Sequence, residues 1–278
     1  MKKNVCLVGA GGKMGLRLTK NLMKEECYNM TYLEVSTEGV MKLRQLGVDV
    51  SKGNHTVKEA DIVILAVPDI VLGDVSSDII PEMKSGAMVY TLDPACALAG
   101  KLFHRDDLTY FIAHPAHPGI FNWEPTAEAQ KDYFGGHLAR QAVVCALFKG
   151  REEEYGTGEE LAAKMYAPVS KVYRITAEQM GMLEPALVET LCSTLQVIVR
   201  EALDIVIEKG VPAEAAREFL LGHINIQLAV LYDQIPGAVF SDAANKAIQN
   251  GKSLLINKDW KKVFEPDHIM QQIKSITE

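Results

Sequence analysis

Two histidines lie three residues apart in the stretch YFIAHPAHPGIFN, residues 110–122, and a proline follows each of them. Imidazole titrates near neutral pH, so His114 and His117 are candidates for substrate binding or acid–base catalysis. The prolines disfavour helical backbone and stiffen the loop that would hold the two rings. The segment contains no third ligand, so a metal site here would need carboxylates from elsewhere. Packing at a strand end is the remaining alternative.

Four polar residues near the middle of the chain form a second candidate group: Glu184 and Glu189 in MLEPALVETL, and His223 and Asn225 in LLGHINI. Apolar residues surround Glu189, so its carboxylate requires a cation, a metal or a substrate hydroxyl as a partner. On an ideal helix, residues five apart point about 140° away from each other. Only a kink, which Pro185 could introduce, or different partners would let both glutamates face one site. The structural alternatives are an interhelical salt bridge or exposed face for the glutamates, and satisfied interface groups for His223 and Asn225.

A glycine cluster in CLVGAGGKMGLRLTKNL, residues 6–22, separates a predicted strand from a predicted helix. Backbone at such a point approaches a pyrophosphate closely, and the N–H groups of the helix face its charge. Gly9, Gly12 and Gly15 lie three apart with Gly11 extra, so the frame Ala10-x-Gly12-x-x-Gly15 is also open. A tight turn without a ligand is the structural alternative. The residues expected at the cofactor are Gly9, Ala10, Gly11, Gly12, Lys13, Met14 and Gly15.

Three further strand ends carry residues for the same crevice. Glu34 ends the second predicted strand, where a carboxylate accepts hydrogen bonds from the adenosine ribose and repels a 2′-phosphate, which favours NAD over NADP. In ILAVPD, residues 64–69, we expect Val67, Pro68 and Asp69 to face the nicotinamide side of the cofactor. Asp69 and Asp93 each fit a helix cap or turn at least as well as a catalytic role.

Seven short apolar runs alternate with amphipathic stretches through the first 175 residues. Unalternating runs separated by crossover segments indicate a parallel sheet covered by helices on both faces. We expect an α/β fold, with a Rossmann-type doubly wound NAD-binding domain over residues 1–176. The predicted strands are residues 4–10, 30–36, 61–67, 87–93, 108–114, 142–148 and 169–175.

The pattern changes to helical spacing from Ala177, and the first helix stops at Lys209-Gly210. We expect residues 177–278 to form an all-helical domain for substrate binding and dimerisation. Apolar side chains lie on more than one face of the first helix, and a lone helical unit of this size would leave them exposed. The sequence therefore predicts a homodimer.

Composition restricts the class of partner. The net charge of −7 and the absence of a long basic run argue against nucleic acid or an anionic membrane. No apolar run approaches the roughly 20 residues that span a bilayer, and the start of the chain is unlike a signal peptide, so we expect a cytoplasmic protein. The five scattered cysteines form no CxxC spacing and are interpreted as reduced. A small-molecule substrate fits best.

Several segments together carry a resemblance to a known family: GAGGKMGLRLTKNLM, DDLTYFIAHPAHPGIFN, DYFGGHLARQ, MYAPV, EQMGMLEPALVET, REFLLGHINI and FSDAANKAI. The chain resembles the D-apionate oxidoisomerase group of the 6-phosphogluconate dehydrogenase-like and ketol-acid reductoisomerase-like superfamily. The likeness implies oxidation of a branched sugar acid with NAD and a 1,2-carbon shift from D-apionate to 3-oxo-isoapionate. We expect the chemistry to use His114, His117, Glu189 and His223 in an interdomain cleft, with Mg²⁺ as a candidate second cofactor.

Two other functions remain open from the sequence. A simple NAD(P)-dependent hydroxy-acid dehydrogenase would share the redox step but not the carbon shift. Such enzymes in this superfamily often use a lysine on the first long helix of the second domain, and residues 177–208 contain none. A non-catalytic NAD-binding regulator would need no polar groups converging at the cleft.

Overall fold

The computed structural model describes residues 2–51, 53 and 55–278, and its contacts divide the chain into two compact units. The first unit comprises Met1–Leu183 together with Met270–Glu278, and the second comprises Glu184–Ile269. The C-terminal segment therefore belongs with the first unit. The assignment of functional domains made from the sequence stays a prediction.

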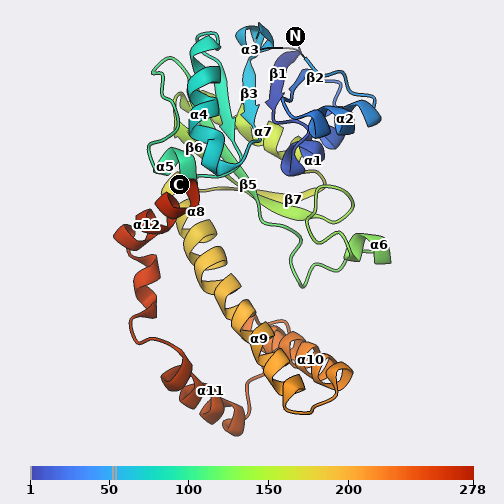
Figure 1. The fold of residues 1–278 in the computed structure, drawn as a ribbon, viewed down its shortest axis with the longest axis vertical. Coiled ribbons are helices and arrows are strands. Elements are labelled where there is room, and N and C mark those ends of the chain that lie inside the picture. Colours follow the sequence, from blue (N-terminus) through green and yellow to red (C-terminus); the bar gives the residue numbers. More distant parts are fainter. Residues whose placement is uncertain (1, 52, 54) are drawn as a thin grey trace. The chain divides into compact units, whose positions relative to one another are not determined.

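A seven-stranded sheet forms the centre of the first unit, in the order β2-β1-β3-β4-β5-β6-β7 (Figure 1). The strand order reverses between β1 and β3, and ligands of doubly wound sheets bind at the carboxyl ends of strands at such a point. The predicted doubly wound fold with a helical C-terminal part is confirmed. The strands are β1 (Lys3–Val8), β2 (Tyr28–Leu33), β3 (Ile62–Leu65), β4 (Met88–Thr91), β5 (Thr109–Pro115), β6 (Gln141–Lys149) and β7 (Val169–Arg174).

One pairing in the sheet differs from the fully parallel arrangement that the sequence predicted. Strands β5 and β6 pair antiparallel, whereas the other neighbouring strands pair parallel. Parallel neighbours need a crossover connection, usually a helix. The segment between β5 and β6, residues 116–140, carries only the four-residue α6 (Ala127–Gln130) and returns without crossing the sheet.

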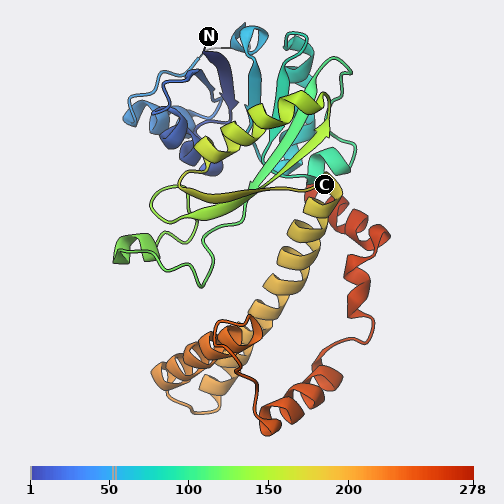
Figure 2. The same ribbon diagram turned by 180° about the vertical axis from the view of Figure 1, so that it is seen from behind.

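Helices cover both faces of the sheet because its central strands are apolar on both sides. Buried residues of α1 (Lys13–Leu22) and α7 (Tyr155–Met165) share one core cluster, and α3 (His55–Glu59) and α4 (Asp69–Ile79) contribute to another. Figure 1 shows α4 in front of the sheet, and Figure 2 shows the yellow-green α7 across the opposite face. Helices α2 (Thr37–Gln45) and α5 (Ala95–Leu98) follow β2 and β4. The strand ends at the crevice are thus fixed from both sides.

The helical part begins at α8 (Ala177–Gly181), where Thr176 and Gln179 form a capping box. The helix then continues as a π-helix over Met182–Ser193 and as α9 (Thr194–Glu208). In the second unit α10 (Ala213–Leu231) packs on α9, and α11 (Asp242–Leu255) follows. The last helix is α12 (Pro266–Thr277). No helix in the described part of the chain is long and apolar enough to cross a membrane.

Candidate active site

The glycine loop joins β1 to α1 and approaches neighbouring backbone closely. Gly9 has φ of +75°, and a Cβ there would lie 2.5 Å from the carbonyl oxygen of Ala66. A Cβ on Gly15 would overlap the carbonyl oxygen of Gly9. Gly9 therefore makes the turn that an L-residue disfavours, and Gly15 allows the helix to pack on the strand. Gly12 is the N-cap of α1 and offers no side-chain cap, so the first N–H groups of the helix can face a phosphate.

Glu34 follows β2 and is bonded to the glycine loop. Its Oε2 accepts a 2.8 Å hydrogen bond from Gly11 N, and its Oε1 accepts from Val35 N at 2.9 Å and Ser36 N at 2.8 Å. A Cβ on Gly39 would lie 2.6 Å from the Glu34 carboxyl carbon. The carboxylate is thus held rigidly beside the loop.

A cavity of about 480 Å³ lies between the ends of β1, β2 and β3. Its walls combine the polar rim of Gly12 and Glu34 with apolar side chains on α4, among them Val71 and Val75. An apolar cleft with a few polar groups at one edge suits an adenosine moiety. Of the predicted cofactor residues, Gly9, Gly12, Glu34, Val67 and Pro68 line the cavity, while Asp69 is the first residue of α4.

His114 lies at the end of β5, and its ring orientation is fixed by the end of β4. Its Nδ1 is 2.8 Å from the carbonyl oxygen of Leu92 and 3.7 Å from Oδ2 of Asp93. A carbonyl oxygen only accepts, so Nδ1 carries the proton and the neutral ring has its lone pair on Nε2. Asp93 also accepts a 2.7 Å hydrogen bond from Ala95 N, which is the turn role expected from the sequence.

His117 is held in the same tautomer by a different partner. Its Nδ1 lies 2.9 Å from the carbonyl oxygen of Phe134, which therefore accepts a hydrogen bond from the ring. The backbone of His117 has φ of +58°, a left-handed conformation that few residues other than glycine adopt. Strained backbone of this kind concentrates at functional sites, where the surrounding structure maintains it. Both histidines thus direct Nε2 rather than Nδ1 away from the backbone.

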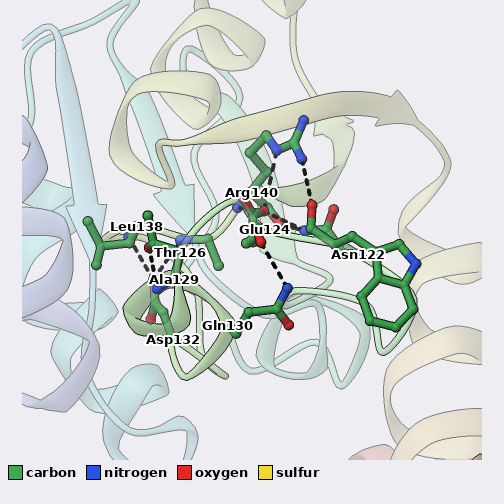
Figure 3. A network of polar contacts seen from close by, with 10 residues as sticks. Asn122, Glu124, Thr126, Ala129, Gln130, Asp132, Leu138 and Arg140 are labelled. Carbon is green, nitrogen blue, oxygen red and sulfur yellow. Dashed lines mark hydrogen bonds and ion pairs between the residues drawn. The ribbon is translucent and has the colours of Figure 1, made fainter.

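The segment that supplies Phe134 is held together by carboxylates (Figure 3). Glu124 Oε1 accepts from Arg140 N at 2.8 Å and from Asn122 Nδ2 at 2.7 Å, and Asp132 Oδ2 accepts from Leu138 N at 2.8 Å. The hydrogen bond from Arg140 N is the largest cause that holds the pKa of Glu124 below its usual value. Both ends of the segment are therefore tied at neutral pH.

A thiol near the strand ends is not a nucleophile. Cys96 lies in α5, directly after β4, and is fully buried. Burial, with a smaller contribution from Asp69, raises the pKa of this thiol to about 11. Because the thiolate is the reactive form, Cys96 stays unreactive at neutral pH.

The π-helix brings Glu184 and Glu189 to one face. Hydrogen bonds in a π-helix join residues five apart, so two residues at this separation lie on successive turns. The 140° separation expected for an ideal α-helix therefore does not apply, and Pro185 lies inside the π-helical segment. His223 and Asn225 on α10 are two residues apart, which puts them on opposite sides of that helix. His223 is exposed and stacks on Phe219 with ring centroids 4.1 Å apart.

Within each unit, the structure brings together some of the predicted residues. Five residues predicted at the cofactor line one cavity, His114 and His117 lie at and just after the end of β5, and the two glutamates share a helix face. Among the described residues, no group of three or more His, Cys, Asp and Glu side chains is arranged to hold a metal ion. The sequence reasoning missed Phe134 and Arg17, which contact each other although they are far apart in the chain. The aromatic pair in DYFGGH was the available signal for Phe134.

Comparisons with known proteins agree with this geometry. Residues 1–123 match the model described as acetohydroxy acid isomeroreductase, NADPH-binding domain, and residues 122–277 match phosphogluconate dehydrogenase (decarboxylating) C-term. The fold and the site define a dinucleotide-dependent oxidoreductase of the 6-phosphogluconate dehydrogenase-like kind.

Individual relatives refine the assignment. D-apionate oxidoisomerase of Cupriavidus necator is 50% identical over 100% of both chains, and that of Rhizobium rhizogenes is 48% identical over 98% of this chain and 99% of its own. A crystal structure from Cupriavidus necator, described as a semialdehyde dehydrogenase NAD-binding protein in complex with calcium and NAD, superposes with a TM-score of 0.97 at 50% identity over 100% of both chains. The chain belongs to the D-apionate oxidoisomerase family, as its resemblance predicted.

Proposed function

We propose that the protein oxidises D-apionate with NAD and rearranges its carbon skeleton to 3-oxo-isoapionate. The observation that carries the proposal is the pair of histidines at and just after the end of β5, each with Nδ1 bonded to a backbone carbonyl. They lie at the same edge of the sheet as the dinucleotide cradle, because β1, β3, β4 and β5 run parallel. Glu34 favours NAD because its carboxylate, held by three backbone N–H groups, accepts from the ribose and repels a 2′-phosphate.

The oxidation step needs a base for the substrate hydroxyl, and NAD supplies the hydride acceptor. In the proposed step, Nε2 of His114 or His117 accepts the hydroxyl proton. Asp93, 3.7 Å from Nδ1 of His114, stabilises the positive charge that develops on that ring. We assign Glu184, Glu189 and one of His223 and Asn225, which lie on opposite sides of α10, to the binding of substrate hydroxyls.

The carbon shift needs the new carbonyl and its neighbouring alkoxide to be polarised together. Two carboxylates on one face of the π-helix are the oxygen ligands that Mg²⁺ accepts, so Glu184 and Glu189 would hold such an ion, which would polarise both oxygens. A metal requirement is tested by assaying turnover after chelation with EDTA and again after Mg²⁺ or Ca²⁺ is restored.

The assay that tests the function follows NADH by absorbance and the product by NMR during incubation with NAD and D-apionate. NADH with a rearranged product supports the proposal. NADH with an unrearranged keto acid would assign the protein to simple hydroxy-acid dehydrogenases. NAD binding without turnover of any sugar acid would make it a regulator instead.

The proposal includes a homodimer in the cytoplasm. Large apolar side chains remain exposed on α9 and α10, among them Val197, Ile205, Phe219 and Ile226, which supports association of two copies through these helices. Light scattering coupled to size exclusion should give twice the chain mass. A charged substitution such as Val197→Glu should then yield the monomer, and fractionation of cells tests the location.

A further inference from the structure

A lysine and an arginine on α1 share one aromatic ring. Cζ of Arg17 lies 4.0 Å from the ring centroid of Phe134, and Nζ of Lys13 lies 5.1 Å from it. The two cations are one helical turn apart, so both reach the same ring. Stacking on an aromatic face holds the guanidinium in one orientation while leaving its N–H edges available.

Neither cation forms an ion pair with a carboxylate in the described part of the chain. Among the described residues, the hydrogen-bond acceptor of Arg17 is Sδ of Met14, at 3.4 Å. By contrast, Lys42 pairs with Glu38 at 2.6 Å and Arg140 pairs with Glu124 at 3.3 Å. Arg17 is also half-buried, which makes an unneutralised charge there less favourable than on the open surface. An anion from outside the chain would satisfy both cations.

Phe134 connects these cations to the proposed acid–base group. The guanidinium of Arg17 stacks on the ring of Phe134, and the carbonyl oxygen of Phe134 accepts the 2.9 Å hydrogen bond from Nδ1 of His117. The rings of Phe134 and His117 also meet edge to face, with centroids 5.8 Å apart. Phe134 therefore fixes the distance between the guanidinium of Arg17 and the imidazole of His117, the proposed acid–base group.

We propose that Arg17, assisted by Lys13, binds the carboxylate of the sugar acid and thereby selects acids over neutral sugars. This inference rests on the proposed function, which gives the substrate a carboxylate. The pyrophosphate of NAD is a less suitable occupant, because the uncapped N–H groups after Gly12 would bind it and Arg17 is a full turn further along α1. A planar guanidinium binds a carboxylate through two parallel hydrogen bonds, which also orients the substrate for His117.

The test compares Arg17→Gln with Lys20→Gln. Lys20 lies on the same side of α1, and its replacement changes the net charge equally, but the cations recorded over the Phe134 ring are Lys13 and Arg17. We expect Arg17→Gln to raise KM for D-apionate about 10- to 100-fold, as for loss of a charged hydrogen-bonding group, with NAD affinity within about twofold of the wild type. Lys20→Gln should leave both unchanged. Phe134→Leu, which removes the ring but keeps an apolar side chain, should raise KM more than it lowers kcat.

A second measurement separates this inference from the proposed function. Malonate has carboxylates but no hydroxyl to oxidise, so its binding to the NAD-loaded protein reports the anion site alone. We expect the wild type to bind malonate and Arg17→Gln to bind it at least about tenfold more weakly. Equal malonate binding by both proteins, or an NAD Kd that rises in step with KM, would overturn the inference. If malonate bound through Arg17 but D-apionate were not oxidised, only the proposed function would be wrong.

Discussion

Replacing Glu34 with glutamine should loosen the glycine loop and weaken NAD binding. The carboxylate has two acceptor oxygens, one bonded to Gly11 N and the other to Val35 N and Ser36 N. A glutamine can keep its oxygen on the side with two donors, but its NH₂ group then faces the N–H of Gly11. The variant loses the bond that joins Glu34 to the loop.

The magnitude follows from the type of bond that is lost. A hydrogen bond to a charged group is worth about 1.5–3 kcal/mol, and partial exposure of Glu34 reduces this to about 1–2 kcal/mol. Since 1.4 kcal/mol corresponds to tenfold in affinity, NAD binding should weaken about 5- to 30-fold. Removal of the negative charge should also narrow the preference for NAD over NADP.

Isothermal titration of Glu34→Gln with NAD and with NADP measures both effects. Glu38→Gln is the matched control, because it removes the same charge nearby from an exposed side chain whose partner is Lys42. Wild-type NAD affinity in Glu34→Gln would refute the reasoning. An equal loss in Glu38→Gln would show that net charge, rather than the hydrogen bond to the loop, controls binding.

Three further predictions concern catalysis, packing and pH. His117→Ala should lower kcat at least about 100-fold with little change in the unfolding temperature, since it removes a proposed base from an exposed position; unchanged turnover would exclude that role. Gly15→Ala should destabilise by about 1–3 kcal/mol through overlap with Gly9, whereas Gly156→Ala, in open space on α7, should stabilise by about 0.4–1 kcal/mol, both measured by urea unfolding. Because the pKa of Glu124 is lowered in the folded protein, its contribution to the free energy of unfolding is complete above its ordinary pKa of 4.5. This contribution is lost as the pH falls through the lowered pKa. The hydrogen-exchange protection factors of residues 116–140, corrected for the intrinsic rate at each pH, should therefore fall in acid, and Glu124→Gln should reduce that dependence.

Much of the fold could be predicted because each central strand is a continuous apolar run. Val5, Ile64 and Tyr90 are fully buried between two helical layers, and such positions leave a clear pattern in the sequence. The antiparallel pairing of β5 and β6 could not be predicted, because strand direction depends on whether the 25 residues between them cross the sheet. The π-helix was also not predicted, because a largely apolar segment has no pattern of polar residues that would distinguish a π-helix from an α-helix.

The candidate site was predictable where it depends on short sequence distances. Gly9, Gly12 and Gly15 lie within one strand-to-helix turn, so their spacing predicts their place. The position of Glu34 at the end of the second strand can be predicted from the usual length of one βαβ unit. The contact between Arg17 and Phe134 depends on the path of an irregular segment that carries no periodicity. Such long-range contacts of surface side chains require the structure.

The central claim is that oxidation and carbon migration occur in one active site. The most direct measurement is ¹³C NMR of the product formed from uniformly ¹³C-labelled D-apionate with NAD, with NADH quantified in the same sample. The account predicts one NADH per product and a changed set of carbon–carbon couplings, because a bond to one carbon has moved to its neighbour. NADH together with the original couplings would contradict the rearrangement and leave a simple dehydrogenase.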